Sequence, residues 1–177
     1  MNNSKRILVA LIFVSFFAWL IGCNKSKDNP LNLTVAENSM SYELNGGETK
    51  FTTCTADIHS TDSFMTVSIS ALSNDDTTRA ISITLGSSYA INGGFTFNES
   101  AASSNAEGFI SYLENTKGYH SLTLNENAAA KVEVQITERT STNVKGTFTG
   151  KLYAQDDQQA APYVITGGQF NAKIVQQ

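Results

Sequence analysis

The chain has 177 residues, a formal net charge of −4 and two cysteines. Apart from Lys5 and Arg6, its Lys and Arg residues are spread singly. The sequence therefore lacks the basic cluster that would replace the counterions of a polyphosphate, and we expect no nucleic-acid partner. The length suits a single domain with a real core.

The N-terminus has the pattern of an export signal. Lys5 and Arg6 precede an apolar run, Ile7 to Ile21, that is too short for the roughly 20 residues a bilayer-spanning helix needs. The run ends in Leu20-Ile21-Gly22-Cys23. These four residues resemble the lipobox of bacterial prolipoproteins, in which branched apolar residues and a small residue precede an obligatory cysteine.

The resemblance implies that residues 1–22 are a signal peptide cleaved before Cys23. It also implies that the Cys23 thiol takes a diacylglyceryl group and that the new α-amine takes an acyl chain such as palmitate. By resemblance to Gram-negative lipoprotein sorting, Asn24 implies a lipid anchor in the outer membrane. Which side of that membrane the protein faces stays open.

Residues 23–38 are predicted to be a flexible linker, because the stretch 24–30 has no apolar residue that burial could hold in place. Loss of the signal leaves ten basic against sixteen acidic residues, a charge of −6, which suits a soluble body held off a membrane. With Cys23 acylated, Cys54 has no disulfide partner.

From residue 39 onward the sequence alternates with period two, which indicates strands with one buried face. Asn45-Gly46-Gly47 predicts a hairpin turn after the strand 40–44, with the chain returning along 51–58. Cys54 shares a face with Ala56 there, so we expect a buried, unreactive thiol. Further strands are expected at 65–69 and 81–85 as one hairpin, irregularly within 86–97, at 108–113 and 119–124 as another hairpin, and at 130–137, 146–153 and 163–174.

No sustained helical period occurs after residue 38. We therefore predict an all-β domain over 39–177, an antiparallel β-sandwich or barrel-like fold. The stretches Val144 to Gly150 and Ile165 to Phe170 resemble small envelope lipoproteins of Bacteroidetes-type bacteria that have no assigned activity. That resemblance implies a β fold and an envelope location, and it carries over no catalytic residue.

Only His59 and His120 are general bases suited to neutral pH. A small envelope hydrolase that uses one of them is the alternative function, but no Gly-x-Ser-x-Gly elbow occurs, and we predict a protein that is not an enzyme. The phase of His120 favours a strand-end histidine with a local hydrogen bond. The spacing of His, Cys and Asp residues predicts no metal site, and no cofactor is expected.

Two features suggest surface chemistry. Tyr112, Tyr119, Tyr153 and Tyr163 are a candidate ligand platform, with buried or cross-strand tyrosines as the alternative. Asp76-Thr77-Thr78 resembles an O-glycosylation sequon of Bacteroidetes-type bacteria, which implies a glycan on Thr77. We expect a lipid-anchored, non-catalytic envelope lipoprotein that binds a protein or glycan partner.

Overall fold

In the computed structural model the chain divides into two compact units, Met1–Asn32 and Leu33–Gln177. The structure describes residues 35–73, 78–99, 105–122, 132–157 and 159–175, all of them in the second unit. Cys23, the predicted signal, most of the predicted linker and Thr77 lie outside the described residues.

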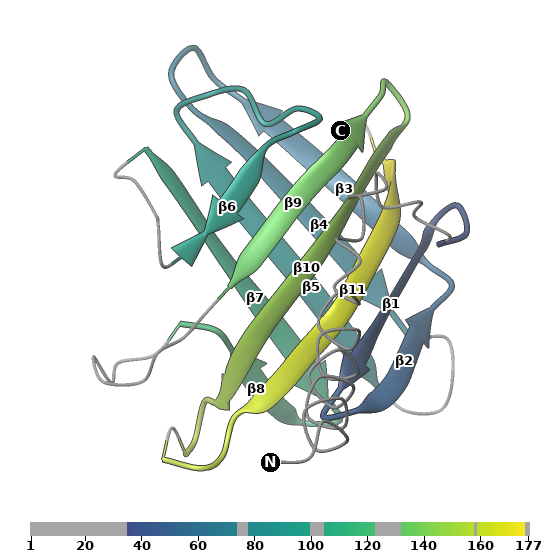
Figure 1. The fold of residues 1–177 in the computed structure, drawn as a ribbon, viewed down its shortest axis with the longest axis vertical. Coiled ribbons are helices and arrows are strands. Elements are labelled where there is room, and N and C mark those ends of the chain that lie inside the picture. The colour runs from purple at the N-terminus through teal and green to yellow at the C-terminus, as the bar shows by residue number, and fades with distance from the viewer. Residues whose placement is uncertain (1–34, 74–77, 100–104, 123–131, 158, 176–177) are drawn as a thin grey trace, which may run out of the picture. The chain divides into compact units, whose positions relative to one another are not determined.

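The described part of the second unit is built from strands, which confirms the predicted all-β class (Figure 1). Its eleven strands are β1 (Ser39–Leu44), β2 (Gly47–Phe51), β3 (Cys54–Ser60), β4 (Met65–Leu72), β5 (Arg79–Ser87), β6 (Thr96–Asn98), β7 (Ala106–Glu114), β8 (Lys117–His120), β9 (Glu133–Arg139), β10 (Asn143–Ala154) and β11 (Tyr163–Ile174).

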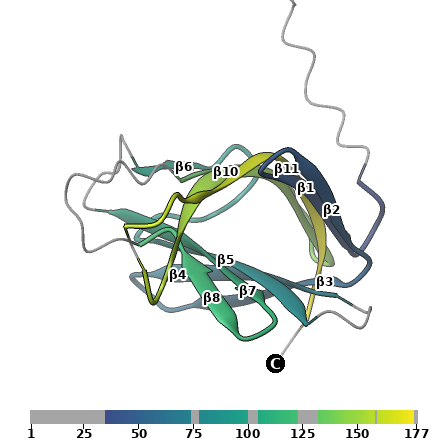
Figure 2. The ribbon, with the colours of Figure 1, turned by 90° about the horizontal axis from the view of Figure 1, so that it is seen from below.

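The strands lie in two facing layers (Figure 2). One layer has the order β2-β1-β11-β10-β9-β6 and the other has the order β3-β4-β5-β7-β8. At one side β11 pairs in parallel with β3 through Lys173↔Thr55 and Ile174↔Ala56. At the other side β10 pairs with β8 through Tyr153↔His120 and Ala154↔Tyr119. The fold is therefore a sandwich with barrel-like closure at both sides.

Inward-facing side chains of both layers form the core. Met40 and Tyr42 of β1 are buried, as predicted from their alternation with Ser41 and Glu43. Cys54 is also buried, which confirms its predicted place on the inner face of β3. The largest fully buried side chains are those of Tyr42, Phe51, Phe148 and Phe170, with Met40 and the aliphatic residues of β4, β5, β7 and β9 around them.

The return strand predicted at 51–58 is wrong, because the chain changes layer within it. β2 ends at Phe51 beside β1, and β3 begins at Cys54 beside β4 in the other layer. Phe51 and Cys54 are both buried although they are three residues apart, so the period-two alternation breaks between them. Thr52 and Thr53 are the exposed residues that make the crossing.

The second predicted hairpin strand, 119–124, ends early. β8 stops at His120, and the Ser121 side chain takes a place in the ladder, because Ile110 N donates to Ser121 Oγ at 3.0 Å. Ser121 N in turn donates to Ile110 O at 2.9 Å. A serine hydroxyl that replaces a backbone carbonyl in this way ends the regular pairing.

Two glycines let β10 and β11 pack closely. The register sets Gly146 opposite Phe170 and Phe148 opposite Gly168, so each glycine faces a phenylalanine across the strands. A Cβ on Gly168 would lie 2.7 Å from Phe148 Cδ1, and one on Gly146 would collide with the Phe170 ring. Gly146-Thr147-Phe148 and Gly168-Gln169-Phe170 share the pattern Gly-x-Phe, and the antiparallel register pairs the glycine of each stretch with the phenylalanine of the other.

Candidate functional site

Three of the four tyrosines predicted as a platform gather inside one end of the sandwich. Tyr119 of β8 and Tyr163 of β11 are stacked, with ring centroids 4.3 Å apart and an interplanar angle of 16°. Tyr112 of β7 lies 6.0 Å from the Tyr119 centroid and 6.4 Å from that of Tyr163. Tyr112 and Tyr119 are buried and Tyr163 is half-buried. Because they share the inward phase of their strands, these rings do not form an exposed platform.

The fourth tyrosine lies elsewhere. Tyr153 is buried opposite His120 in the β10–β8 register, whereas Tyr119 lies opposite Ala154, on the other face of the sheet. The structure therefore brings Tyr112, Tyr119 and Tyr163 together and leaves Tyr153 outside their cluster.

The tyrosine cluster is polar at its centre. Tyr112 Oη donates to Glu114 Oε1 at 3.3 Å, and Tyr119 Oη donates to Tyr163 Oη at 3.3 Å. The hydrogen bond with Tyr119, together with burial and the nearby Glu114 carboxylate, raises the pKa of Tyr163 to about 12. Burial, and then the charge of Glu114, also raises the pKa of Tyr112. These phenols therefore stay protonated at neutral pH.

Tyr42 adds a further buried phenol to the interior. Its ring contacts Phe51 and Phe148, and burial raises its pKa. Its Oη has no hydrogen-bond partner among the described residues. A buried water would satisfy a hydroxyl of this kind.

The outer face of the second layer carries a row of hydroxyl groups across several strands. Ser70 of β4 lies opposite Ser82 of β5, and Ser82 lies opposite Ser111 of β7. The row continues from Ser111 to His120 and then to Tyr153. Ser70 Oγ donates to Ser82 Oγ at 3.4 Å. Because neighbouring side chains in this row are small, this part of the sheet surface is a polar depression.

A shallow groove of about 410 Å³ lies along this row. Leu72 and Leu113 border it and are 58% and 38% exposed, so apolar side chains are accessible beside the hydroxyl row. Gln155 lies against Gly118, where an added Cβ would be 2.7 Å from Gln155 Oε1. The groove is lined by Ser70, Ala71, Leu72, Ala80, Ile81, Ser82, Ser111, Tyr112, Leu113, Thr116, Gly118, Tyr119 and Gln155, none of which is charged.

The two histidines lie on different strands of the second layer, His59 on β3 and His120 on β8. His59 is exposed near the end of β3 and lies opposite Thr66. His120 lies opposite Ser111 on the outer face of the sheet. The Glu114 carboxylate accepts a hydrogen bond from Tyr112 and faces inward, so it lies on the other face from His120 and Ser111. The local hydrogen bond predicted for His120 is not found at Nδ1, which is buried without a partner among the described residues.

The described residues contain neither a metal-binding cluster nor a membrane-spanning helix. In that part of the chain, no group of three His, Cys, Asp or Glu side chains is placed to hold a metal ion. Among the same residues, no helix has the length and apolar character needed to cross a membrane.

The groove was missed at the level of sequence, although a signal for it is present. Ser68 and Ser70, Ser82 and Thr84, and Ser111 occupy the outward positions of three expected strands. When the pairing of the strands is known, Ser and Thr residues at their alternate positions predict a row of hydroxyl groups on one face of the sheet. The hairpin of 65–69 with 81–85 was predicted, but the pairing of 81–85 with the strand at 108–113 was not.

Comparison with protein-family models, with curated proteins and with solved structures finds no match to this chain.

Proposed function

We propose that this protein is a lipid-anchored, non-catalytic binding protein of the cell envelope, and that the uncharged groove holds a neutral glycan. The observation that carries the proposal is the groove lining, which combines serine hydroxyls and the Gln155 amide with the apolar side chains of Leu72 and Leu113. Sugars present hydroxyl groups and C–H faces together, and these groups suit such a lining. An uncharged lining also leaves no charge unpaired when a neutral ligand covers it.

The anchor in this proposal is Cys23, at the end of the lipobox-like sequence. One acyl chain holds a protein only marginally, whereas two or more chains give stable attachment. Residues 23–38 would then separate the β-sandwich from the membrane surface. A glycan partner in the envelope would be within reach of a domain held in this way.

Binding is tested with the full-length lipoprotein in detergent on an array of neutral oligosaccharides. Ser82 lies in the middle of the hydroxyl row, so Ser82→Arg places a long charged side chain across the groove floor. We expect this variant to lose at least about tenfold in apparent affinity, which is about 1.4 kcal/mol.

The matched control is Ser41→Arg, at a half-buried strand position in a second groove of about 450 Å³ beside β1 and β2. It should bind as the wild type does. Equal loss in both variants, or no retention of any neutral oligosaccharide, would reject the glycan; retention of a purified envelope protein instead would replace it with a protein partner.

The anchor is tested separately by Cys23→Ala, with intact mass and membrane fractionation as measurements. The wild type should carry lipid mass at Cys23 and sediment with membranes, and the variant should be released. A wild type without lipid, or a variant that stays membrane-bound to the same extent, contradicts the anchor without bearing on the groove.

A further inference from the structure

Tyr119 and Tyr163 are stacked in a geometry that suits oxidative coupling of their two phenol rings. Their centroids are 4.3 Å apart at 16°, and their hydroxyl oxygens are 3.3 Å apart. Rings that are nearly parallel can hold their hydroxyls this close only when both point the same way. The carbons ortho to each hydroxyl therefore face one another across the stack.

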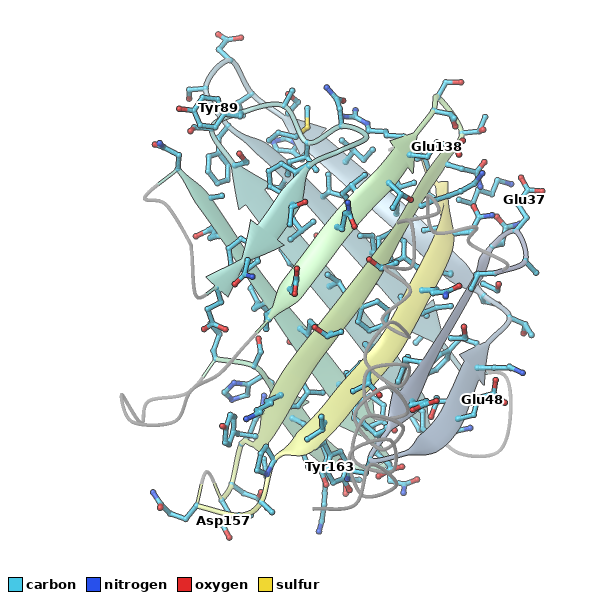
Figure 3. All side chains as sticks on the ribbon, viewed as in Figure 1. Glu37, Glu48, Tyr89, Glu138, Asp157 and Tyr163 are labelled. Carbon is cyan, nitrogen blue, oxygen red and sulfur yellow. The ribbon has the colours of Figure 1, made fainter. Side chains whose placement is uncertain are left out.

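The pair also has a route for losing protons. Glu114 accepts a hydrogen bond from Tyr112, and its negative charge contributes to the raised pKa of Tyr163. A carboxylate next to a phenol can take the phenolic proton when the ring is oxidised. Tyr163 is half-buried. It lies at the lower end of the sandwich in Figure 3, so oxidising equivalents can reach the pair from that end.

We propose that Tyr119 and Tyr163 form an oxidative crosslinking site, at which a haem peroxidase with hydrogen peroxide converts the pair to an intramolecular dityrosine. Each phenol loses one electron and its hydroxyl proton, and the two radicals join through a carbon–carbon bond between ortho positions. The displaced ortho hydrogens move to the oxygens as the rings become aromatic again. The two electrons and two protons removed reduce one hydrogen peroxide to two waters.

Tyr112 and Tyr89 are less suited to this coupling. Tyr112 is tilted by 38° and 50° to its two neighbours, with its centroid at least 6.0 Å away. Tyr89 is 66% exposed and lies at the opposite end of the sandwich, so it can couple only to a second molecule (Figure 3). The structure thus assigns one intramolecular product.

The crosslink would join the two layers. Tyr119 is on β8 and Tyr163 on β11, and in the described ladder β8 meets β10 through only two residue pairs. A covalent bond at this side would reinforce a short seam and restrict the unfolded chain. We expect the crosslinked protein to unfold at higher denaturant concentration than the untreated protein.

The experiment treats full-length protein, carrying Tyr89→Phe to suppress intermolecular coupling, with horseradish peroxidase and hydrogen peroxide. The expected product is a monomer lighter by two hydrogen atoms, with dityrosine fluorescence and a crosslinked peptide that joins Tyr119 to Tyr163. Adding Tyr163→Phe should abolish that product, with circular dichroism confirming the fold.

Three outcomes would overturn the proposal. They are a treated monomer of unchanged mass, a crosslink mapped to any other pair, and persistence of the mass loss and fluorescence in the Tyr163→Phe background. Mapping in the Tyr89→Phe protein decides the matter even if Tyr163→Phe does not fold.

Discussion

At Gly146 and Gly168, a single hydrogen atom in place of a side chain decides how closely β10 and β11 approach. Each of these glycines is covered by a phenylalanine of the other strand. The glycine gives up strand propensity, and the aromatic ring gains contact with the bare backbone. Both glycine–phenylalanine contacts are formed between β10 and β11 alone, so their effect on packing is local.

We predict that Gly146→Ala and Gly168→Ala each lower the free energy of unfolding by about 1–3 kcal/mol, the usual cost of overpacking a core. The new methyl of Gly146→Ala meets Gln135 O and the Phe170 ring, and that of Gly168→Ala lies 2.5 Å from Phe148 O. Urea denaturation measures the change. The control is Gly47→Ala, whose methyl meets only Leu44 O at 3.4 Å and should change stability by less than about 0.5 kcal/mol. Equal effects at all three positions would contradict this explanation.

Cys54 is predicted to be inert in the folded protein. It is fully buried, and burial raises the pKa of its thiol to about 12 from 9.0, so neither access nor ionisation favours attack on an electrophile. A bulky maleimide should label it only after denaturant is added. Rapid labelling under native conditions would show that β3 opens or that the thiol is accessible.

The same thiol gives a pH dependence whose sign follows from linkage. Between pH 9 and 12 the unfolded thiol ionises while the folded one stays protonated, so the folded state binds more protons and stability falls as pH rises. The slope from this group approaches about 1.4 kcal/mol per pH unit. Urea midpoints followed above pH 9 should fall less steeply for Cys54→Ala than for the wild type. Parallel curves would rule this contribution out.

Among the elements, β9 helps to hold the segment between β5 and β6 through the side chain of Arg139, beside backbone hydrogen bonds such as that from Gly94 N to Ile136 O. Arg139 Nη1 donates to Ile91 O at 2.9 Å and to Asn92 Oδ1 at 3.2 Å, and it lies 3.3 Å from Met65 Sδ. Ile91 is fully buried although it belongs to no strand. The arginine therefore fixes an irregular segment over one end of the sandwich.

We predict that Arg139→Lys loosens this segment, because a single ammonium cannot reproduce the planar guanidinium contacts. Stability should fall by about 1 kcal/mol, and amide hydrogen exchange should accelerate around Ile91 more than elsewhere. The control is Lys145→Gln, which removes a partly exposed ion pair with Glu138 and should cost less than about 1 kcal/mol. Uniform acceleration of exchange along the chain would argue against a local role for Arg139.

Element positions could be predicted well where a strand keeps strict alternation and ends at a turn residue. Asn45 and Gly46 both have positive φ, as the predicted turn requires, and β1 and β2 pair around them. The prediction failed where a tertiary event interrupts a run of strand-forming residues. The layer change after Phe51 and the Ser121 hydroxyl in the ladder are such events, and local preference does not encode them.

For the whole molecule, the class of fold was predictable and its closure was not. The parallel pairing of β11 with β3 joins Thr55 to Lys173, and no local sequence feature marks partners so far apart. The same limit applies to the sites. The tyrosines could be chosen by residue type, but the choice between an exposed platform and an inward stack depends on which strands face each other. The groove needed the order of four strands before its residues formed a row.

Strand β11 pairs with β1, β10 and β3, and so it takes part in both layers. Among the eleven described strands it is also the last that a ribosome makes. Until then β1 lacks one neighbour and β3 lacks its parallel partner, which leaves edges open to pairing with other chains. The interval before β11 arrives is therefore the stage of synthesis at which β1 and β3 are exposed to pairing with other chains.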